Sequence, residues 1–556
     1  YPVIKRSLAD DSLVTASANG LVKGETSFID WREQSYPKWM QCADIYNSEA
    51  LGTSIVHAQA LKLMSQMAAE LGKKKEAADY AARSQQMAQA INRELWMPEK
   101  GYYAMYTYGR DFHILNPRAE TLGESLAILY DIATPEQARA ISENNPTTPF
   151  GAAIFFPQTA DMPPYHNNSL WPWVAAYWAM ANAKTGNEQG TLEAIGSVFR
   201  PAALFTTNKE NFVLDNGDIA TELNSSNMLW CLAGNLALTH KILFGIEFMP
   251  EGLAFHPFVP KALGSERSLD NFRYRNAVLD ITVSGHGDRI KEFRLNGKPH
   301  APLLPADIKG HNKVEIVMAD NDIAPLKVNH TANVKAPLTP IARFDGYKLR
   351  WQSIEYIDHY KVLRNGVTVA ETTATSYDAS EPGEYQVIGV SGNGVESFAS
   401  EPLSNAATFS IEMPGEGTSL ISDEITYQPR ARVDAYSGHG FVEVDHNSKP
   451  VVVEFDAPDE GLYSIEYVYA NGNGPVNTEN RCAIRTVSVD GKRLGTVVMP
   501  HRGVGNWNDW GTTNSLKLKL AKGKHKISLE FRPENENMNL KTNHAAIDRV
   551  IVKKLK

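Results

Sequence analysis

The first 245 residues carry hydrophobic side chains at the three- and four-residue spacing of a helix. Polar and charged residues separate these positions, and Gly or Asn follows several of the segments. The segments that show this pattern are residues 49–72, 73–96, 118–132, 135–144, 169–186, 188–205 and 222–245. We therefore expect seven helices, mostly in antiparallel pairs.

Two long stretches separate these helices, residues 96–117 and 145–168. Long structured loops between helices are uncommon unless they serve a functional site. We therefore expect functional residues in or beside them.

The rest of the chain changes to short alternating segments punctuated by turn residues, which is typical of strands. The pattern predicts a small β domain over residues 246–334, a β-sandwich over 335–408 and a third β module over 409–556. With a helical domain over 1–245, the fold class is multidomain, all-α followed by all-β.

Charge, hydrophobicity and cysteine content exclude several classes of function. The chain has 556 residues, a formal charge of −9 and only three cysteines. A dispersed negative charge argues against nucleic acid as the main partner. The longest apolar stretch is far shorter than the roughly 20 residues of a membrane span. Three scattered cysteines give neither a disulfide framework nor a metal-binding spacing.

The first candidate site lies in residues 24–40, where three carboxylates stand among aromatic residues. Aromatic rings stack on the apolar faces of sugars, and a partly desolvated carboxyl stays protonated and can act as an acid. An ordinary surface loop of mixed composition is the alternative. The residues are Glu25, Asp30, Glu33, Trp31, Arg32, Tyr36 and Trp39.

Two further polar stretches precede predicted helices. Tyr165, His166 and Asn167 come before a Trp-Pro-Trp helix start at Trp171. The alternative is a capped helix with its tryptophans in the core. Residues 211–224 lead to Glu222, which could also be a first-turn carboxylate favoured by the helix dipole.

Together these segments resemble the six-hairpin glycosidases, (α/α)6 barrels that include trehalases, glucosidases and glycogen-debranching relatives. Their acid loop reads Glu-Ser-Gly-(Trp/Met)-Asp, and Glu25-Thr-Ser-Phe-Ile-Asp30 is similar with one extra residue. Residues 166–173 loosely match a mid-barrel motif. Glu222, 192 residues after Asp30, has the place of the general base. The resemblance covers residues 1–333.

The resemblance implies inverting hydrolysis of an α-linked, glucosidic bond in an oligo- or polysaccharide, without a catalytic cofactor. Asp30 would be the acid, with Glu25 and Glu33 as alternatives, and Glu222 the base, about 6.5–9.5 Å from it. The residues expected to hold the sugar are Glu25, Trp31, Arg32, Trp39, Tyr165, His166, Asn167 and Trp171.

The predicted helices are too few for a complete barrel. A six-hairpin barrel needs about twelve helices, and the pattern predicts seven. We therefore expect an upstream segment or a companion chain to complete it. Similar multi-module layouts are typical of secreted, periplasmic or cell-surface proteins.

The C-terminal modules also resemble known families. Residues 335–408 are similar to a fibronectin type III domain with Trp351 and Tyr385 in its core. Residues 409–556 are similar to a jelly-roll carbohydrate-binding module. This resemblance implies sugar contacts from Tyr469, Asn471, Trp507 and Asn543, with the tryptophan in the core as the alternative, and a structural Ca²⁺ on Glu412, Glu416 and Asp548.

Two other functions remain open at this point. A polysaccharide lyase on an α/α toroid would use Tyr165 and His166 as acid and base. A non-catalytic glycan-binding protein would retain only the binding activity of its terminal module.

Overall fold

The computed structural model describes residues 1–29, 31–415, 417, 433–473, 481–537 and 542–556. The chain forms two compact units. Unit 1 comprises Tyr1–Ala90, Tyr106–Asn116 and Ala336–Lys556, and unit 2 comprises Ile91–Met105 and Pro117–Lys335. Two candidate site residues, Asp30 and Glu416, lie outside the described residues.

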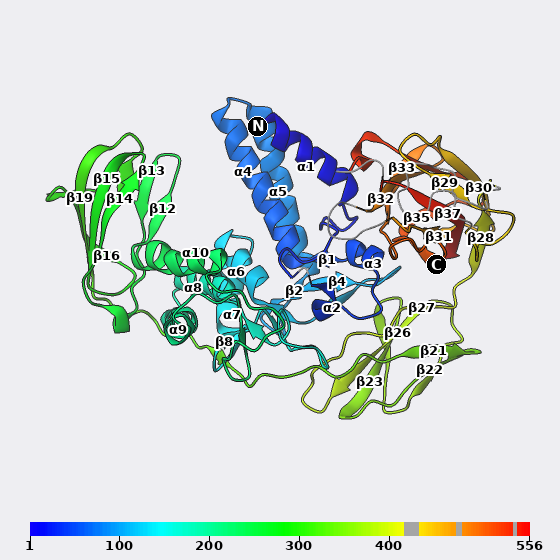
Figure 1. The fold of residues 1–556 in the computed structure, drawn as a ribbon, viewed down its shortest axis with the longest axis horizontal. Coiled ribbons are helices and arrows are strands. Elements are labelled where there is room, and N and C mark those ends of the chain that lie inside the picture. The colour runs from blue at the N-terminus through cyan, green and yellow to red at the C-terminus, as the bar shows by residue number, and fades with distance from the viewer. Residues whose placement is uncertain (30, 416, 418–432, 474–480, 538–541) are drawn as a thin grey trace. The chain divides into compact units, whose positions relative to one another are not determined.

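The helices at the start of the chain pack through apolar faces. Leu8 from α1, Leu61 and Met64 from α4, and Tyr80 from α5 form one buried cluster. In Figure 1, α4 and α5 run side by side, and α1 leaves them at an angle. Sequence analysis predicted α4 and α5 but not α1, α2 or α3. The bounds are α1 Pro2–Val14, α2 Arg32–Ser35, α3 Cys42–Asn47, α4 Leu51–Glu70 and α5 Lys74–Glu94.

The helices of unit 2 are arranged around α8, which contacts α6, α7, α9 and α10. Local capping explains several boundaries. Thr134 and Gln137 form a capping box at α7, Asn187 caps α9, and Gly186 ends α8 in the left-handed conformation. The bounds are α6 Thr121–Leu129, α7 Pro135–Asn144, α8 Pro172–Thr185, α9 Glu188–Phe205 and α10 Leu229–Ala237, which continues as a π-helical turn, Leu238–Leu243. Their placement within a six-hairpin toroid stays a prediction.

Four predicted helix starts are wrong. Residues 49–50 and 119–120 form strands β1 and β6, so α4 begins at Leu51 and α6 at Thr121. Residues 169–170 form strand β10 rather than the first turn of α8, and Trp171 is its N-cap residue. The last helix begins at Leu229, so Glu222 lies in the preceding loop and not in a first helical turn.

Short strand pairs connect the N-terminal ends of the unit 2 helices. Strand β6, Ala119–Glu120, pairs with β9, Phe155–Phe156. The adjoining Ile154 N–H donates to Ser169 O, and β10, Ser169–Leu170, pairs with β11, Phe212–Val213. This ladder brings the starts of α6 and α8 beside the loop that precedes α10.

Residues 246–318 form two sheets, as the strand pattern predicted. Phe255, Leu279 and Ile316 are among the buried residues of their common core. The three-stranded sheet is β12 Ile246–Phe248, β13 Gly252–Phe255 and β18 Leu303–Pro305. The five-stranded sheet has the order β14 Arg267–Tyr274, β15 Asn276–Ser284, β19 Lys309–Met318, β16 Ile290–Leu295 and β17 Lys298–Pro299.

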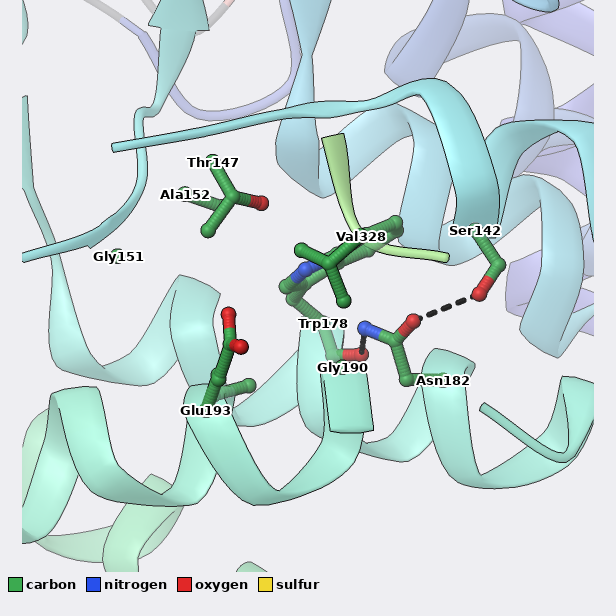
Figure 2. A pocket seen from close by; sticks show the side chains of 10 residues that line it. Ser142, Thr147, Gly151, Ala152, Trp178, Asn182, Gly190, Glu193 and Val328 are labelled. Carbon is green, nitrogen blue, oxygen red and sulfur yellow. Dashed lines mark hydrogen bonds between the residues drawn. The ribbon is translucent and has the colours of Figure 1, made fainter. Parts of the chain in front are cut away.

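The segment after β19 returns to the helices. Strand β20, Asn329–His330, pairs in parallel with β7, Pro146–Thr148, and Gln158 N–H donates to Val334 O. Beneath this segment lies a cavity of about 10 Å³, where Val328 faces Trp178 and Ser142 Oγ donates to Asn182 Oδ1 at 2.7 Å (Figure 2). It has room for about one water molecule and is too small for a sugar.

Residues 342–404 form a sandwich of two antiparallel sheets, as expected. Trp351 and Tyr385 lie in its core, which confirms that prediction. The fibronectin type III assignment stays a prediction. One sheet is β21 Ala342–Asp345, β22 Lys348–Trp351 and β25 Ser376–Asp378. The other is β24 Val367–Thr372, β23 Ile357–Arg364, β26 Glu384–Ser391 and β27 Leu403–Ser404.

The last described strands form a second sandwich, whose core includes Tyr463, Val487 and Val550. One sheet has the order β28 Thr408–Glu412, β37 Ala545–Lys554, β31 Gly461–Ala470 and β34 Gly511–Thr512, with β29 Val442–Val444 on β37 and β35 Leu516–Leu520 on β31. The other is β30 Val451–Ala457, β36 Gly523–Glu530, β32 Ala483–Val489 and β33 Lys492–Met499. No helix within the described residues has the length and hydrophobicity to cross a membrane.

Candidate functional site

Aromatic rings gather at the N-terminal end of α8. The ring of Tyr165 lies 4.8 Å from His166 and 5.1 Å from Trp171, and His166 lies 5.3 Å from Trp171, measured between ring centres. The Trp171 indole N–H donates to Tyr165 O at 2.8 Å. The structure therefore brings together three of the residues that the sequence singled out. His166 and Trp171 are each only 1% exposed, so their expected sugar contact is corrected to a packing role beside the half-buried Tyr165.

A row of rings continues from this group along α8. Trp230 of α10 lies 5.5 Å from Trp171 and stacks on Trp173 at 5.8 Å, and Trp173 meets Tyr177 edge-on at 5.8 Å. Trp230 is 40% exposed and offers part of its ring to solvent. Sequence analysis missed Trp230, because nothing in its helical pattern distinguishes an exposed ring from a core ring.

Glu210 is a buried carboxylate in contact with the same group, and sequence analysis did not identify it. Tyr165 Oη donates to Glu210 Oε1 at 3.3 Å, and Ser225 N–H donates to Glu210 Oε2 at 3.3 Å. Its position depends on the pairing of β10 with β11, which the sequence pattern does not reveal.

Glu222 lies on the surface of the loop that precedes α10. Its backbone N–H donates to Pro164 O at 2.9 Å, so its segment runs beside the residues leading to Tyr165. Asn224 Nδ2 fastens the same loop to Asn211 O and Ile219 O. The second and third candidate segments therefore adjoin one another, as their shared function requires.

Asn167 has a structural role in place of the predicted sugar contact. Its side chain is buried, with Oδ1 accepting from Thr159 N–H at 2.7 Å and Nδ2 donating to Thr159 O and Met162 O. Both ends of the amide are thus used to close the loop that carries Tyr165.

Asp215 holds the neighbouring Asn168 in place. Asn333 Nδ2 donates to one Asp215 oxygen at 2.7 Å and Asn168 Nδ2 to the other at 2.9 Å. These two hydrogen bonds hold the pKa of Asp215 below its usual range. Asn168 has a positive φ of 52°, a strained conformation that this clamp helps to fix.

Two further carboxyls are buried at the start of α6. Glu120 Oε1 accepts from Gly123 N–H at 3.3 Å, and Glu124 Oε1 accepts from Tyr103 N–H at 2.9 Å. Burial raises the pKa of Glu120 to about 8 and that of Glu124 well above its usual range. The Glu120 carboxyl is therefore largely protonated at neutral pH.

The acid segment of unit 1 is described except for Asp30. Arg32 Nε binds Glu25 Oε2 at 2.9 Å, an exposed ion pair, and Glu33 is exposed. Trp31 is half-buried as the N-cap residue of α2. Arg32 thus engages a neighbouring carboxylate, and its contact with a sugar stays a prediction.

Trp39 packs against another part of unit 1. Its indole N–H donates to Ala399 O at 2.9 Å, and the Arg110 guanidinium lies 5.6 Å from its ring centre. Trp39 is half-buried, and its contact with a sugar stays a prediction.

Glu49 is a buried carboxylate of unit 1 that sequence analysis also missed. It accepts hydrogen bonds from Ser17, from Asn19 at 2.9 Å and from Thr107 at 2.7 Å. Burial opposes its ionisation, but His113 and the hydroxyl donors outweigh this and lower the pKa of Glu49 to about 2. It is therefore a fixed anion that joins β1, Glu49–Ala50, to β4, Tyr106–Tyr108.

The four candidates in the C-terminal sandwich are all buried, contrary to the expectation of exposed sugar contacts. Asn543 Oδ1 accepts from Ile484 N–H and from Arg485 Nη1, and Asn471 Nδ2 donates to Met499 O. Their exposed fractions are 2% for Tyr469, 0% for Asn471, 1% for Trp507 and 0% for Asn543. This burial gives them packing and loop-fastening roles.

The described residues form no calcium cage. Asp548 is buried, accepts from Ser437 N–H and Oγ, both at 2.8 Å, and pairs with Arg549, while Glu412 is exposed. Within the part of the chain that the structure describes, no three His, Cys, Asp or Glu side chains are grouped as metal ligands. A calcium ion in this module stays a prediction.

Comparison with protein families identifies two segments. Residues 4–145 match the bacterial alpha-L-rhamnosidase 6 hairpin glycosidase domain, and residues 425–552 match the family 6 carbohydrate binding module. A curated relative, a cycloisomaltooligosaccharide glucanotransferase of Niallia circulans, is 29% identical over 121 residues. That match covers 21% of this chain and only 11% of the relative.

Similar solved structures include carbohydrate-binding modules. A CBM35 from Cellvibrio japonicus Abf62 is 21% identical and covers 27% of this chain and 95% of that one, with a TM-score of 0.19. A cycloisomaltooligosaccharide glucanotransferase of Paenibacillus sp. complexed with cycloisomaltoheptaose is 19% identical and covers 27% and 18%, with a TM-score of 0.20.

The two family matches confirm the resemblance to six-hairpin glycosidases over residues 4–145 and to a carbohydrate-binding module over residues 425–552, while its extension to residue 333 stays a prediction. The chain carries a glycoside-hydrolase-like domain of the six-hairpin type followed by a carbohydrate-binding module.

Proposed function

We propose that this protein hydrolyses an α-linked glycosidic bond in an oligo- or polysaccharide, with inversion, while its terminal module binds the same glycan. The six-hairpin match supports the reaction class and the module match supports a saccharide ligand. This pairing also supports action on polysaccharide outside the cytoplasm, in a secreted or periplasmic protein.

The aromatic group at the start of α8 is the observation that carries the proposal. The exposed part of Trp230 lies beside Trp171, Tyr165 and His166, with Glu210 behind Tyr165. An exposed indole can stack on a pyranose face, while the phenol of the half-buried Tyr165 can bind its hydroxyls. Replacing Trp230 by Ala should therefore raise KM more than it lowers kcat.

We assign the acid role to Asp30 and the base role to Glu222, as the family resemblance implies. The exposed position of the Glu222 carboxylate suits a base that draws a proton from water. Glu210 is the second candidate for the base, because it is buried and hydrogen-bonded to Tyr165.

Single substitutions distinguish these roles. Glu222→Gln should lower kcat by at least about 10²-fold, and Asp30→Asn should do the same, since each removes one proton-transfer group. Glu136→Gln, at an exposed position of α7, is the matched control and should leave kcat unchanged. A large loss in Glu210→Gln with normal turnover in Glu222→Gln would transfer the base role to Glu210.

Substrate and stereochemistry need separate measurements. The names of the relatives point to α-glucosides and α-L-rhamnosides, so p-nitrophenyl forms of both sugars are the first substrates to compare. Proton NMR of the first product should show the inverted anomer. Retention with transfer to a second sugar would indicate a transferase, and an unsaturated, ultraviolet-absorbing product would indicate a lyase. If no glycan is changed, the protein would be a non-catalytic glycan-binding protein.

A further inference from the structure

A groove opens at the C-terminal ends of α6 and α8. Its volume is about 1070 Å³, and unit 2 supplies all of its walls. One wall comes from Tyr130, Tyr177 and Lys184 at the helix ends. The other comes from the strand region, with Phe255 and Phe258 among its residues.

This groove opens at the other end of α8 from the aromatic group described above, and the two share only the ring row, whose last member, Tyr177, meets Trp173 edge-on at 5.8 Å. Helix α8 runs from Pro172 to Thr185, and at 1.5 Å per residue these ends lie about 20 Å apart. Trp171 stands before its first turn, whereas Lys184 and Gly186 line the groove at its last turn. A ligand in the groove would therefore not occupy the candidate catalytic site.

Two tyrosines give the groove both apolar and polar surface. Tyr130 and Tyr177 are half-buried, and within the described residues neither hydroxyl has a hydrogen-bond partner. Burial, and to a lesser degree Tyr177, raise the pKa of Tyr130. Each offers a ring edge or face together with a free donor and acceptor.

The charged residues of the groove are largely matched. Lys184 Nζ binds Asp131 Oδ1 at 2.6 Å, and His256 lies 3.5 Å from Glu247. Lys241 stands 5.0 Å above the ring of Phe248. Matched charges give no strong field of either sign, so the groove does not suit a polyanion.

We infer that this groove binds a neutral oligosaccharide, as a second glycan site at the opposite end of α8 from the candidate catalytic site. A sugar chain presents apolar ring faces and a rim of hydroxyls that both donate and accept hydrogen bonds. Aromatic rings, free phenols and matched charges meet these needs, and the volume is typical of a ligand site. The inference rests on the proposed carbohydrate specificity but not on hydrolysis.

Hydrogen–deuterium exchange on the full chain tests the inference without relying on activity. The probes are isomaltoheptaose, maltoheptaose and cellohexaose, each titrated to saturation. At least one should slow exchange saturably in peptides that cover residues 129–133, 177–186 and 241–258. Peptides from the terminal module are distinct from those of the groove, so ligand binding at the module is measured separately.

Substitutions of groove-lining residues test whether the protection from exchange comes from ligand binding in the groove. Tyr130→Ala should weaken protection of the groove peptides by about tenfold in ligand concentration, which corresponds to about 1.4 kcal/mol. Hydrolysis of a p-nitrophenyl glycoside should be unchanged. The matched control is Tyr356→Ala, at a tyrosine of unit 1 that is 89% exposed, and it should bind normally. If Tyr130→Ala does not fold, Tyr130→Phe, which removes only the hydroxyl, should also weaken the protection.

Three outcomes would overturn the inference. They are no protection from any of the three probes, protection from an oligogalacturonate alone, and protection that the tyrosine variants leave unaltered. Protection of the groove in a protein that hydrolyses nothing would uphold this site and reject the proposed reaction instead.

Discussion

Single buried carboxyls are the clearest electrostatic feature at the residue scale. One oxygen of Glu120 accepts a hydrogen bond from Gly123 N–H. Within the described residues, its other oxygen is buried without a hydrogen-bond partner. Burial raises its pKa to about 8, so the folded protein binds a proton at pH 7 that the unfolded chain releases. Such a group lowers stability progressively as pH rises from about 4.5 to 8.

Glu120→Gln should remove this dependence. The amide is close in shape to the protonated carboxyl, keeps an oxygen for Gly123 N–H and cannot ionise. The variant should therefore gain stability relative to the wild type at pH 8 but not at pH 4.5, as measured by urea unfolding followed through tryptophan fluorescence. Glu136→Gln, exposed on α7, should give no such difference. Equal gains at both pH values would contradict the argument.

The sequence predicted which site residues lie beside one another in some cases, but it did not predict which of their side chains reach solvent. Tyr165, His166 and Trp171 lie together because they are close in sequence and precede one helix. Trp507 looked like a sugar platform, yet it is buried beside Gly472, where an added Cβ would lie 2.6 Å from the indole. Whether a loop tryptophan faces solvent depends on such long-range contacts, which spacing alone does not encode.

At the scale of elements, boundaries were predictable where local chemistry sets them. Helices α7 and α9 begin and end where the pattern placed them, because Thr134 and Asn187 cap their first turns. The two-residue strands β10 and β11 were not predicted, since each exists only through its distant partner. These pairs determine where Glu210 lies, so the site was only partly readable from the sequence.

A buried charge cluster connects several elements of unit 1. Lys553 of β37 lies 3.3 Å from Asp111 and 3.0 Å from Glu466 of β31. Glu384 of β26 accepts from the backbone N–H groups of Asp111 and Phe112, both at 3.1 Å. Burial and the charge of Asp111 raise the pKa of Glu384 to about 7, so one ammonium faces more carboxyls than it can neutralise.

Glu384→Gln should therefore make this cluster less sensitive to pH. In the wild type the junction should lose stability as pH rises from about 4.5 to 7, because folding then requires a proton that the unfolded chain has released. Hydrogen exchange of the backbone amides in residues 110–112 and 384–391 measures this loss. After correction for intrinsic exchange rates, these amides should exchange faster at pH 7 than at pH 4.5. The variant should show a smaller change. An identical pH dependence in the wild type and Glu384→Gln would refute the role of Glu384 in this pH dependence.

At the scale of the whole molecule, the two compact units interleave along the chain. The chain passes between them at residues 90–91, 105–106, 116–117 and 335–336. The sequence pattern suggested consecutive modules, because it records local periodicity and not the pairing of Glu49 with Thr107 across β1 and β4.

This interleaving predicts which fragments fold. A fragment of residues 91–335 should melt cooperatively, whereas residues 117–335 should be less stable by at least about 3 kcal/mol. The shorter fragment lacks Tyr103, which is fully buried and donates its N–H to Glu124 and its hydroxyl to Asn92. Circular dichroism of both fragments during heating checks this. Equal melting temperatures would show that residues 91–105 add nothing.

The row of rings along α8 gives the molecule a built-in optical reporter. Trp171, Trp230 and Trp173 are separated by 5.5 and 5.8 Å, and Tyr177 follows at 5.8 Å. Indoles this close pass excitation energy from one to the next, so their emission behaves as that of a single chromophore. A molecule seated against Trp230 or against Tyr177 would therefore change the same fluorescence band, and competition between two unlabelled sugars could be followed without any dye.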